Sequence, residues 1–299
     1  MDFVSGEILT DIGFKSGYIG FEKEKIVETG KGNPPKKPIC KGLIVPTFIN
    51  AHTHIGDSFI REKKIDLPKN VKQLVAPPNG LKHKLLREAS DEDIIDGMEK
   101  SIDIMIKNGT RYFCDFRENG ILGISHLKAA LQSGNLTSLI LSRPDSLNYN
   151  KNEVDILLKN SDGIAISSIS DWDYSELQKV ARDTRHKNKI FALHASERIR
   201  ENIDDILDLK PNFKLLKKVE VNLLLGTDNA MLNSPVILEE LNYLRSTTKE
   251  FSTMELLYMI TFGARKALNL DCDILGPNSK ADFVVLGKKS LKPLYISFG

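Results

Sequence analysis

A short apolar run that ends in two histidines restricts the folds open to this chain more than any other stretch. The run covers residues 43–54 and ends in His52-Thr53-His54. Alternate residues of a strand share one face, so a buried strand here points both imidazoles the same way, about 7 Å apart at a rise of about 3.3 Å per residue. Such a pair can bind one divalent ion, although an isolated pair is equally typical of chance or of a hydrogen-bonded core pair.

Length and charge restrict the class of protein. The 299 residues can form one large domain or two small ones, with a sizeable core. Charged residues make up 27% and the net charge is only +2, so we expect neither nucleic acid nor an anionic membrane as a partner. Residues 1–7 do not resemble a signal peptide and no stretch approaches the length of a membrane span, so we expect a soluble protein.

The cysteines indicate a reducing compartment. Cys40, Cys114 and Cys272 lie far apart and lack C-x-x-C spacing. This spacing argues against a disulfide framework and against a thiolate zinc site. We therefore predict a cytoplasmic location. The oligomeric state stays open, a homo-oligomer included.

The segment after His54 is unusual for its length. It runs from Ile55 to about Ala89 and contains Pro68, Pro77 and Pro78. Loops longer than about 15 residues are uncommon in compact domains and often act as lids. Because this segment leaves the histidine end of the strand, we predict a lid over a pocket.

Beyond this segment, strand and helix patterns alternate. A helix opens at Ser90 with capping and first-turn acids and ends near Gly109. The pattern then predicts strands over 111–116, 137–141, 163–169 and 190–194, and helices over 120–132, 153–159, 174–186, 195–208, 234–244 and 253–268. Such alternation is typical of parallel strands with helical crossovers. Glycine-punctuated apolar runs before residue 30 predict small antiparallel strands, which we expect to pair with strands from residues 270–299.

Four stretches in order resemble motifs of the amidohydrolase superfamily: residues 46–54, 191–197, 223–229 and 281–286. The resemblance covers about residues 40–286 and implies a (β/α)8 TIM-like barrel over 46–269. It also implies an accessory β-sandwich built from residues 1–45 and 270–299. Active sites of such barrels lie at the C-terminal strand ends, where His54, His194 and Asp228 fall.

The resemblance further implies one divalent metal ion. His52, His54, His194 and Asp228 would hold it with an open position for water; zinc is the default, and iron and manganese also accept these ligands. Residues 163–169 lack the lysine that bridges two metals in part of the family, which favours a single ion. Taken alone, Asp228 in Gly-Thr-Asp-Asn is also typical of a turn.

Glu197 points to one branch of the superfamily. It follows His194 by three residues, an H-x-x-E arrangement similar to that of the cytosine and guanine deaminase-like branch and of archaeal-type metal-dependent hydrolases. The resemblance implies deamination of a small cyclic amidine, of purine, pyrimidine or pterin type, by metal-activated water. Asp228 would accept a proton and Glu197 would protonate the intermediate so that ammonia leaves. Taken alone, Glu197 is also typical of a first-turn helix acid.

The substrate of such an enzyme is a small heterocyclic molecule. Polar side chains near strand ends or in the long segment are candidates to contact it, or else are salt-bridged or solvated: Arg61, Arg117, Glu118 and Arg143. Three other histidines are expected at the surface: His83, His126 and His186. Trp172 either stacks on a ring or packs against the barrel. Two rival functions are hydrolysis of a cyclic amide or imidazolone, and binding by a non-catalytic barrel.

The strand count of the barrel is incomplete. A unit of an eight-stranded barrel averages roughly 31 residues, yet only residues 209–221 separate the fifth unit from the Asp228 strand. Strands six and seven therefore appear to be missing, either by a real deletion or because the sequence omits a stretch. We favour omission, because losing two strands would expose unpaired edges. An encoded sequence that runs without interruption from Phe213 to Lys217 would refute it.

Overall fold

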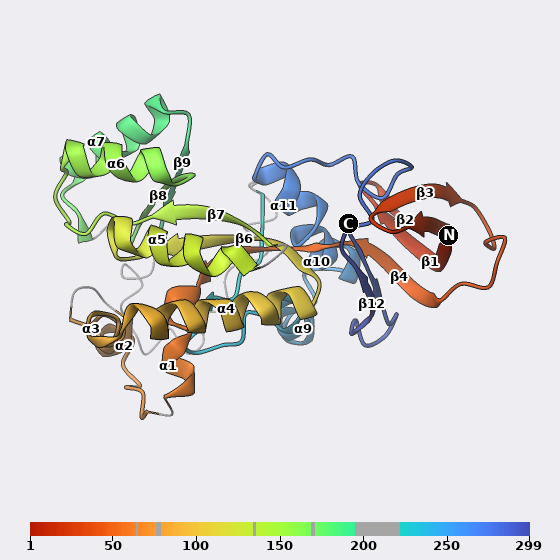
Figure 1. The fold of residues 1–299 in the computed structure, drawn as a ribbon, viewed down its shortest axis with the longest axis horizontal. Helices are drawn as coiled ribbons and strands as arrows, with labels where there is room; N and C mark the ends of the chain where they lie inside the picture. Colours follow the sequence, from red (N-terminus) through yellow and green to blue (C-terminus); the bar gives the residue numbers. More distant parts are fainter. Residues whose placement is uncertain (64, 76–78, 134–135, 169–170, 195–221) are drawn as a thin grey trace.

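The structure is a computed structural model that describes residues 1–63, 65–75, 79–133, 136–168, 171–194 and 222–299 (Figure 1). Its strands form two six-stranded sheets. One sheet lies at the end of the molecule that carries both termini, and the other lies among the helices (Figure 1). No described helix is both long and apolar enough to cross a bilayer.

Both ends of the chain contribute to the first, accessory sheet. Its strands, in chain order, are β1 (Asp2–Thr10), β2 (Gly13–Glu22), β3 (Lys25–Gly30), β4 (Cys40–Pro46), β11 (Phe283–Leu286) and β12 (Pro293–Ser297). Their order in the sheet is β12-β11-β4-β1-β2-β3, and only β1 and β4 pair in parallel. The two ends therefore share one sheet, as predicted, but β11 pairs with β4 rather than with a strand before residue 30. The limits of the two domains, at residues 45 and 270, stay a prediction.

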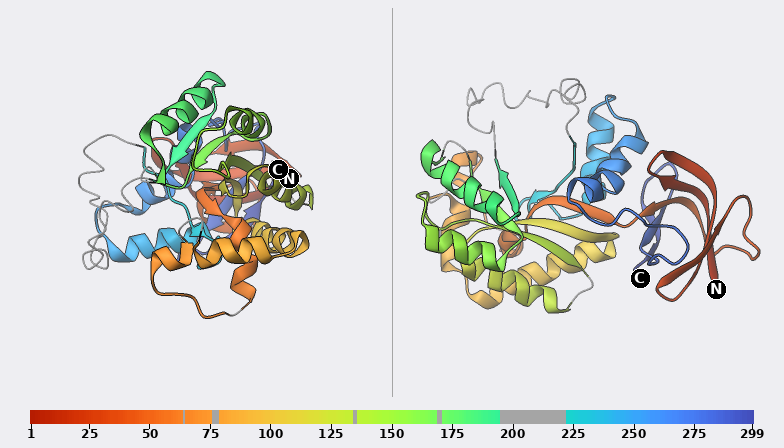
Figure 2. Two further views of the ribbon diagram at one scale, coloured as in Figure 1. Left: turned by 90° about the vertical axis from the view of Figure 1, so that its left-hand side faces the viewer. Right: turned by 90° about the horizontal axis from the view of Figure 1, so that it is seen from above.

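The second sheet is the parallel sheet of a TIM-like barrel. It contains β5 (Phe48–His54), β6 (Thr110–Arg117), β7 (Thr137–Ser142), β8 (Gly163–Ile166), β9 (Ile190–Leu193) and β10 (Asp228–Asn229), in the order β10-β5-β6-β7-β8-β9. All five of its pairings are parallel. The curl of this sheet is visible in Figure 2. The predicted α/β class with helical crossovers is confirmed.

Helices cover the outer face of the barrel sheet. They are α4 (Asp91–Lys107), α5 (Gly120–Ala130), α6 (Lys151–Asn160) and α7 (Tyr174–His186). Helix α4 starts where the sequence predicts, because the Ser90 side chain accepts a hydrogen bond from the Asp93 amide at 3.1 Å. Its apolar stripe, which includes Ile94, Met98 and Ile102, is buried in the largest apolar cluster of the barrel. Sequence periodicity therefore predicts this layer well.

Strands β4 and β5 form one extended run that crosses from the accessory sheet into the barrel. Only Thr47 separates them, and residues 42–50 are buried throughout. The apolar sequence of this run explains its burial on both faces, as in the central strands of α/β proteins. The run ends at the histidine pair, so both sheets help to position it.

The segment between β5 and α4 is helical and packed, so the prediction of a long irregular loop is wrong. It contains η1 (Ile55–Asp57), α1 (Phe59–Glu62), α2 (Val71–Val75) and α3 (Leu81–Glu88). Phe59 and Ile60 are buried in the core cluster. Gly97 permits this packing, since a Cβ atom there would lie 2.7 Å from the Phe59 amide nitrogen. The segment forms a wall beside β5.

The predicted helix over residues 253–268 is two helices, α10 (Thr253–Met259) and α11 (Phe262–Ala267). The break has a cause outside the helix. The Ile260 carbonyl accepts a hydrogen bond from the Ile49 amide of β5 at 2.8 Å, and the Thr261 hydroxyl donates to the Leu257 carbonyl at 2.6 Å. Tertiary pairing thus uses a carbonyl that a continuous helix would need.

Three further predictions concern the part of the chain that follows β9. Helix α9 (Ile237–Thr247) begins three residues after the predicted start at 234. The predicted helix over 195–208 and the gap where strands six and seven are missing lie outside the described residues.

Candidate active site

Three imidazoles converge at the C-terminal ends of the barrel strands. His52 and His54 end β5, and His194 directly follows β9. One nitrogen of each ring can be chosen so that all three lie within 4.8 Å of one another. The ring centroid of His194 is 5.1 Å from that of His52 and 5.8 Å from that of His54. The structure therefore brings His194 to two histidines that lie at least 140 residues before it in the chain.

Asp228 joins this cluster from β10. Its Oδ1 atom lies 3.3 Å from His52 Nε2 and 3.5 Å from His54 Nε2. Ligand atoms around a tetrahedral zinc ion with bonds of about 2.0–2.1 Å are separated by about 3.4 Å. The two distances from Asp228 match this separation, and the three histidine nitrogens lie within 4.8 Å of one another. Three imidazoles beside a carboxylate are a donor type that fits such an ion. The structure thus clusters three of the predicted ligands and places the fourth, Asp228, beside two of them.

The chain before Asp228 lies directly against β5. The Leu225 carbonyl accepts a hydrogen bond from the Ala51 amide at 2.9 Å. A Cβ atom on Gly226 would lie 2.5 Å from His52 Cβ and 2.6 Å from its backbone nitrogen, so only glycine fits. Asp228 itself has a φ of +57°, a left-handed conformation that Asp tolerates better than most residues. This close approach sets the distance between the carboxylate and the imidazoles.

A buried aspartate holds β5 and β6 together beneath the histidines. Asp115 Oδ2 accepts hydrogen bonds from the Thr53 hydroxyl at 3.0 Å and from the Ile55 amide at 2.9 Å. These donors flank His54 on both sides. Arg117 Nη1 lies 3.2 Å from Asp115 Oδ1, so the buried carboxylate is compensated.

Glu118 and a backbone carbonyl orient two of the imidazoles. Glu118 Oε1 lies 2.8 Å from His54 Nδ1, and the Ile166 carbonyl lies 3.0 Å from His194 Nδ1. A proton on each Nδ1 directs the Nε2 lone pair into the cluster, as in metal sites generally. Burial lowers the pKa of His54 to about 3, so the ring is neutral at pH 7. Neutral imidazole is the form that binds a metal.

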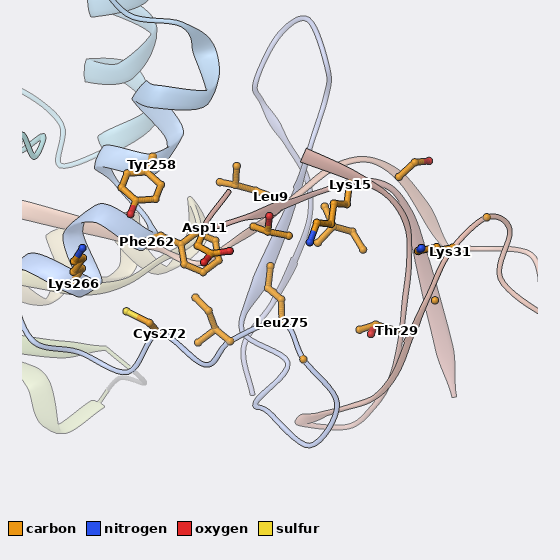
Figure 3. Close-up of a pocket in the computed structure, with 17 residues that line it drawn as sticks. Leu9, Asp11, Lys15, Thr29, Lys31, Tyr258, Phe262, Lys266, Cys272 and Leu275 are labelled. Carbon is orange, nitrogen blue, oxygen red and sulfur yellow. The ribbon is translucent and has the colours of Figure 1, made fainter. Parts of the chain in front are cut away.

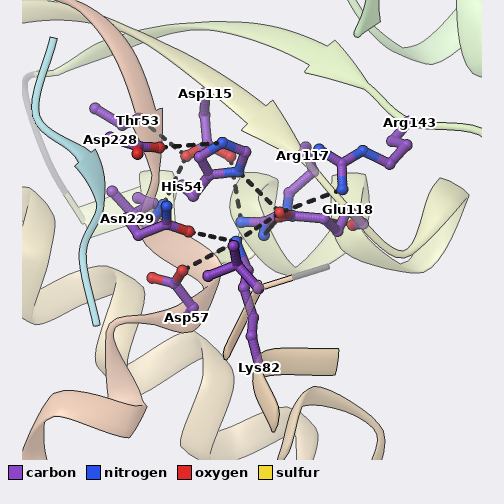
Figure 4. A network of polar contacts seen from close by, with 12 residues as sticks. Thr53, His54, Asp57, Lys82, Asp115, Arg117, Glu118, Arg143, Asp228 and Asn229 are labelled. Atoms are coloured by element: carbon purple, nitrogen blue, oxygen red, sulfur yellow. Dashed lines mark hydrogen bonds and ion pairs between the residues drawn. The ribbon is translucent and has the colours of Figure 1, made fainter. Parts of the chain in front are cut away.

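Lys82 of α3 lies below this arrangement, almost completely buried (Figure 4). Its Nζ lies 2.7 Å from Glu118 Oε1, 3.0 Å from Asp57 Oδ2 and 2.8 Å from Asn229 Oδ1. Burial raises the pKa of Asp57 to about 6. Burial also opposes the charge on Glu118, but Lys82 and His54 outweigh it and hold the pKa of Glu118 well below its usual range. Glu118 and Lys82 are therefore an ion pair.

The sequence did not point to Lys82 or to Asp57. Lys82 lies in a segment whose pattern predicts a loop, and nothing distinguishes it from the other lysines of the chain. The one signal that could have found Asp57 is its position three residues after His54, which places a carboxylate near the same strand end.

The predicted substrate contacts have different surroundings. Arg117 is only 2% exposed, and its Nη2 lies 2.9 Å from Glu118 Oε2, which argues against contact with a substrate. Arg61 donates to the carbonyls of Ala230 and Asn233, and so holds the turn after β10. Arg143 is partly buried, with Nη1 3.7 Å from Glu118 Oε1. Glu197, the predicted proton donor, lies outside the described residues.

The three remaining histidines and Trp172 are not part of the histidine cluster. His126 is only 4% exposed and its Nε2 lies 2.9 Å from Asp91 Oδ1, so its prediction as a surface residue is wrong. The cause is that α5 packs against the start of α4. His83 is half-buried, with Nε2 3.2 Å from the Val75 carbonyl, and His186 is exposed. Trp172 is buried in the barrel core cluster.

A cleft of about 1250 Å³ lies elsewhere, between the accessory sheet and helices α10 and α11 (Figure 3). Leu9, Phe262 and Leu275 line it together with Lys15 and Lys266. None of the clustered histidines contributes to it. The chemistry of the side chains, rather than the size of a cavity, therefore identifies the candidate site.

Comparisons with known proteins agree with the fold and the motifs. The amidohydrolase family model matches residues 43–210 and 208–297. An uncharacterized protein of Methanocaldococcus jannaschii is 33% identical over 288 residues, which cover 77% of this chain and 74% of that protein. A protein of Archaeoglobus fulgidus named as a candidate aminohydrolase is 30% identical, over 67% of this chain and 68% of its own length.

Solved structures share the fold at low sequence identity. N-isopropylammelide isopropylaminohydrolase of Burkholderia multivorans superimposes with a TM-score of 0.70 at 15% identity, covering 97% of this chain and 93% of that chain. 5-Methylcytosine deaminase of Klebsiella pneumoniae gives 0.70 at 12% identity, over 96% and 91%. A zinc complex of atrazine chlorohydrolase from Arthrobacter aurescens gives 0.67 at 15% identity, over 96% and 87%.

The matches also bear on the incomplete strand count. The two segments matched by the family model meet at residues 208–210, at the start of the stretch that is too short to hold strands six and seven. The alignment with the M. jannaschii protein spans 288 residues but covers only 77% of this chain, so it includes positions that this chain lacks. The parallel barrel and the family match over more than half of the chain lead to one conclusion. The chain belongs to the amidohydrolase family, whose members depend on metal ions, and is a hydrolase that acts on carbon–nitrogen bonds.

Proposed function

We propose that this hydrolase deaminates a small cyclic amidine of purine, pyrimidine or pterin type. The proposal places one divalent ion, zinc by default, among His52, His54, His194 and Asp228. The observation that carries it is the position of the Asp228 carboxylate, 3.3 Å and 3.5 Å from two imidazole nitrogens of the cluster.

The donor set supports a catalytic rather than a structural ion. An ion held by three imidazoles and one carboxylate would bind water by expanding to five-coordinate, and the set contains none of the thiolates that are usual in structural zinc sites. When bound, a divalent ion would supply the Lewis acidity that makes water a nucleophile near pH 7.

The residues of the chain then have separate tasks. Glu118 holds the His54 ring with Nε2 toward the cluster. Asp228, whose side chain is 60% exposed, takes up a proton as water adds to the amidine carbon. Glu197 is proposed to carry a proton to the leaving nitrogen. The net change is a new carbon–oxygen bond, a broken carbon–nitrogen bond and the release of ammonia.

Relatives favour amine release over other carbon–nitrogen hydrolyses. Two archaeal proteins, 30% and 25% identical, are named as candidate aminohydrolases. One structure of the same fold is a cytosine-type deaminase bound to 5-fluorocytosine. The rival functions are hydrolysis of a cyclic amide or imidazolone and binding without catalysis.

Ammonia release distinguishes these functions. The zinc-loaded protein is incubated with purines, pyrimidines, pterins and cyclic amides, while ammonia and ring opening are measured separately. We expect stoichiometric ammonia from at least one cyclic amidine, and a loss of at least about a hundredfold in rate in Asp228→Asn. Ring opening without ammonia would instead identify a cyclic amide hydrolase. A protein that binds far less than one equivalent of metal and turns over nothing would identify a binding module.

A further inference from the structure

We propose that Lys82 is a positioning residue of the metal centre, one that sets its metal affinity without touching the ion. The inference rests on the proposed function only in taking the histidine cluster as the metal site. Its basis is that the three acceptors around the Lys82 ammonium lead to two parts of that cluster: Glu118 to His54, and Asn229 and Asp57 to the turn at Asp228 (Figure 4).

The first connection runs to His54. Lys82 Nζ lies 2.7 Å from Glu118 Oε1, and the same oxygen lies 2.8 Å from His54 Nδ1. Glu118 also lies 2.9 Å from Arg117 through its other oxygen. The ammonium and the guanidinium thus hold the carboxylate from two sides. The imidazole that it orients therefore has little freedom to rotate.

The second connection runs to Asp228. Lys82 donates to Asn229 Oδ1 at 2.8 Å, and Asn229 is the neighbour of Asp228 in β10. Asp57, the third partner of Lys82, accepts a hydrogen bond from the Met231 amide at 2.9 Å. Lys82 and Asp57 together therefore fix the turn that follows Asp228.

Burial and charge set this lysine apart from the other lysine of α3, Lys84. Lys82 is 3% exposed, whereas the Lys84 side chain is 62% exposed. Three cations (Lys82, Arg117 and Arg143) face three carboxylates (Asp57, Asp115 and Glu118). These buried charges neutralise one another, so the network is not suited to bind an ionic substrate. Its geometry indicates instead that it orients the candidate metal ligands.

The test uses metal affinity and coordination rather than activity. Lys82→Met removes the contacts but leaves Asp57 uncompensated, and this can unfold the protein. The double variant Lys82→Met with Asp57→Asn removes one charge of each sign, which keeps the buried network balanced. Lys100→Met is the matched control, because Lys100 also pairs with two carboxylates but is exposed on α4.

Zinc dissociation constants are measured by competition with a chelator, and the absorption of the Co²⁺-loaded protein reports coordination. We expect both Lys82 variants that fold to bind zinc about 10- to 100-fold more weakly with an altered Co²⁺ spectrum, and the control to be unchanged. Wild-type affinity and spectrum in the double variant would overturn the inference.

Asn229→Ala provides a second route that does not depend on the folding of the Lys82 variants. It cuts only the link between Lys82 and β10, and we expect a several-fold loss of zinc affinity. In the double-variant background the same substitution should have no further effect, as expected for two residues that act through one contact. Unchanged affinity in Asn229→Ala, or a loss that adds in full to that of the double variant, would contradict the proposal. If the wild type binds zinc but deaminates nothing, only the proposed function fails.

Discussion

At the scale of single residues, the site depends on the missing side chain of a glycine as much as on the side chains of the candidate ligands. Gly226 allows the chain before Asp228 to lie against His52. Gly226 lies within the motif at residues 223–229, but its packing role could not be read from the sequence, because the need for glycine arises from a strand more than 170 residues away. The four candidate ligands, in contrast, are visible in the sequence since they follow strand patterns and match motifs in order.

Substitution of Gly226 tests this view. Gly226→Ala would place a Cβ atom 2.5 Å from His52 Cβ, so the segment must move away from β5. We expect a loss of about 1–3 kcal/mol in the free energy of unfolding together with weaker zinc binding. Chemical unfolding and chelator competition measure the two effects. Gly276→Ala is the control, because the nearest atom to a Cβ there is 3.8 Å away, and it should change neither.

A second test at this scale concerns pH. Burial lowers the pKa of His83 to about 4, below the usual value of 6.5. The unfolded chain therefore binds a proton between these values while the folded protein does not, so stability falls as the pH drops below 6.5. We expect up to about 1 kcal/mol to be lost between pH 6.5 and 5.5.

Unfolding by urea at several pH values checks this expectation in the metal-free protein. His83→Gln should reduce the slope of stability against pH in that range, because it removes the titrating ring. An identical slope in the variant and the wild type would contradict it.

Burial of charged residues explains what the sequence could not reveal at this scale. Lys82 and Glu118 are buried because each finds partners on other elements, and Arg117 because it pairs with Asp115 and Glu118. Charged residues are almost never buried without partners, so a lone lysine in a sequence is correctly expected at the surface. His126 was misjudged for the same reason, since its partner Asp91 lies on another helix.

At the scale of elements, periodicity and capping predicted most of the barrel. Helix α7 has the predicted limits, Tyr174–His186; β6 extends one residue beyond the predicted limits at each end, and β7 extends one residue beyond at its C-terminal end. The two predictions of elements that were wrong share a cause, namely contacts with distant parts of the chain. The break between α10 and α11 follows from the hydrogen bond between Ile49 and Ile260, and the helices after β5 are short elements stabilised by burial of residues such as Phe59.

The cap of α4 gives a test at this scale. Ser90→Ala removes the acceptor for the Asp93 amide, and we expect a loss of about 1 kcal/mol in the free energy of unfolding. Ser125→Ala in the exposed part of α5 is the control, because that hydroxyl only donates to the Leu122 carbonyl of its own helix. A loss as large in the control as in Ser90→Ala would show that the cap is not the cause.

At the scale of the whole molecule, a metal ion at the site would join β5, β9 and β10, which come from distant parts of the chain. Removing it should therefore lower stability as well as abolish activity. We expect zinc at about 100 times its dissociation constant to stabilise the protein by about 2.7 kcal/mol.

Thermal unfolding with a chelator, with zinc, and with zinc in Asp228→Asn measures this stabilisation. The variant should lose most of the gain that the wild type shows. An equal shift in the wild type and the variant would mean that zinc binds elsewhere.

The order of strands in the accessory sheet has a consequence for biosynthesis. Strand β11 pairs with β4 on the side opposite β1, yet almost 240 residues separate β4 from β11 in the chain. While the ribosome makes the intervening part, one edge of β4 has no partner from this sheet, and exposed strand edges promote aggregation. A nascent chain that stalls before residue 283 should therefore depend on chaperones, and this dependence should end once the last two strands emerge.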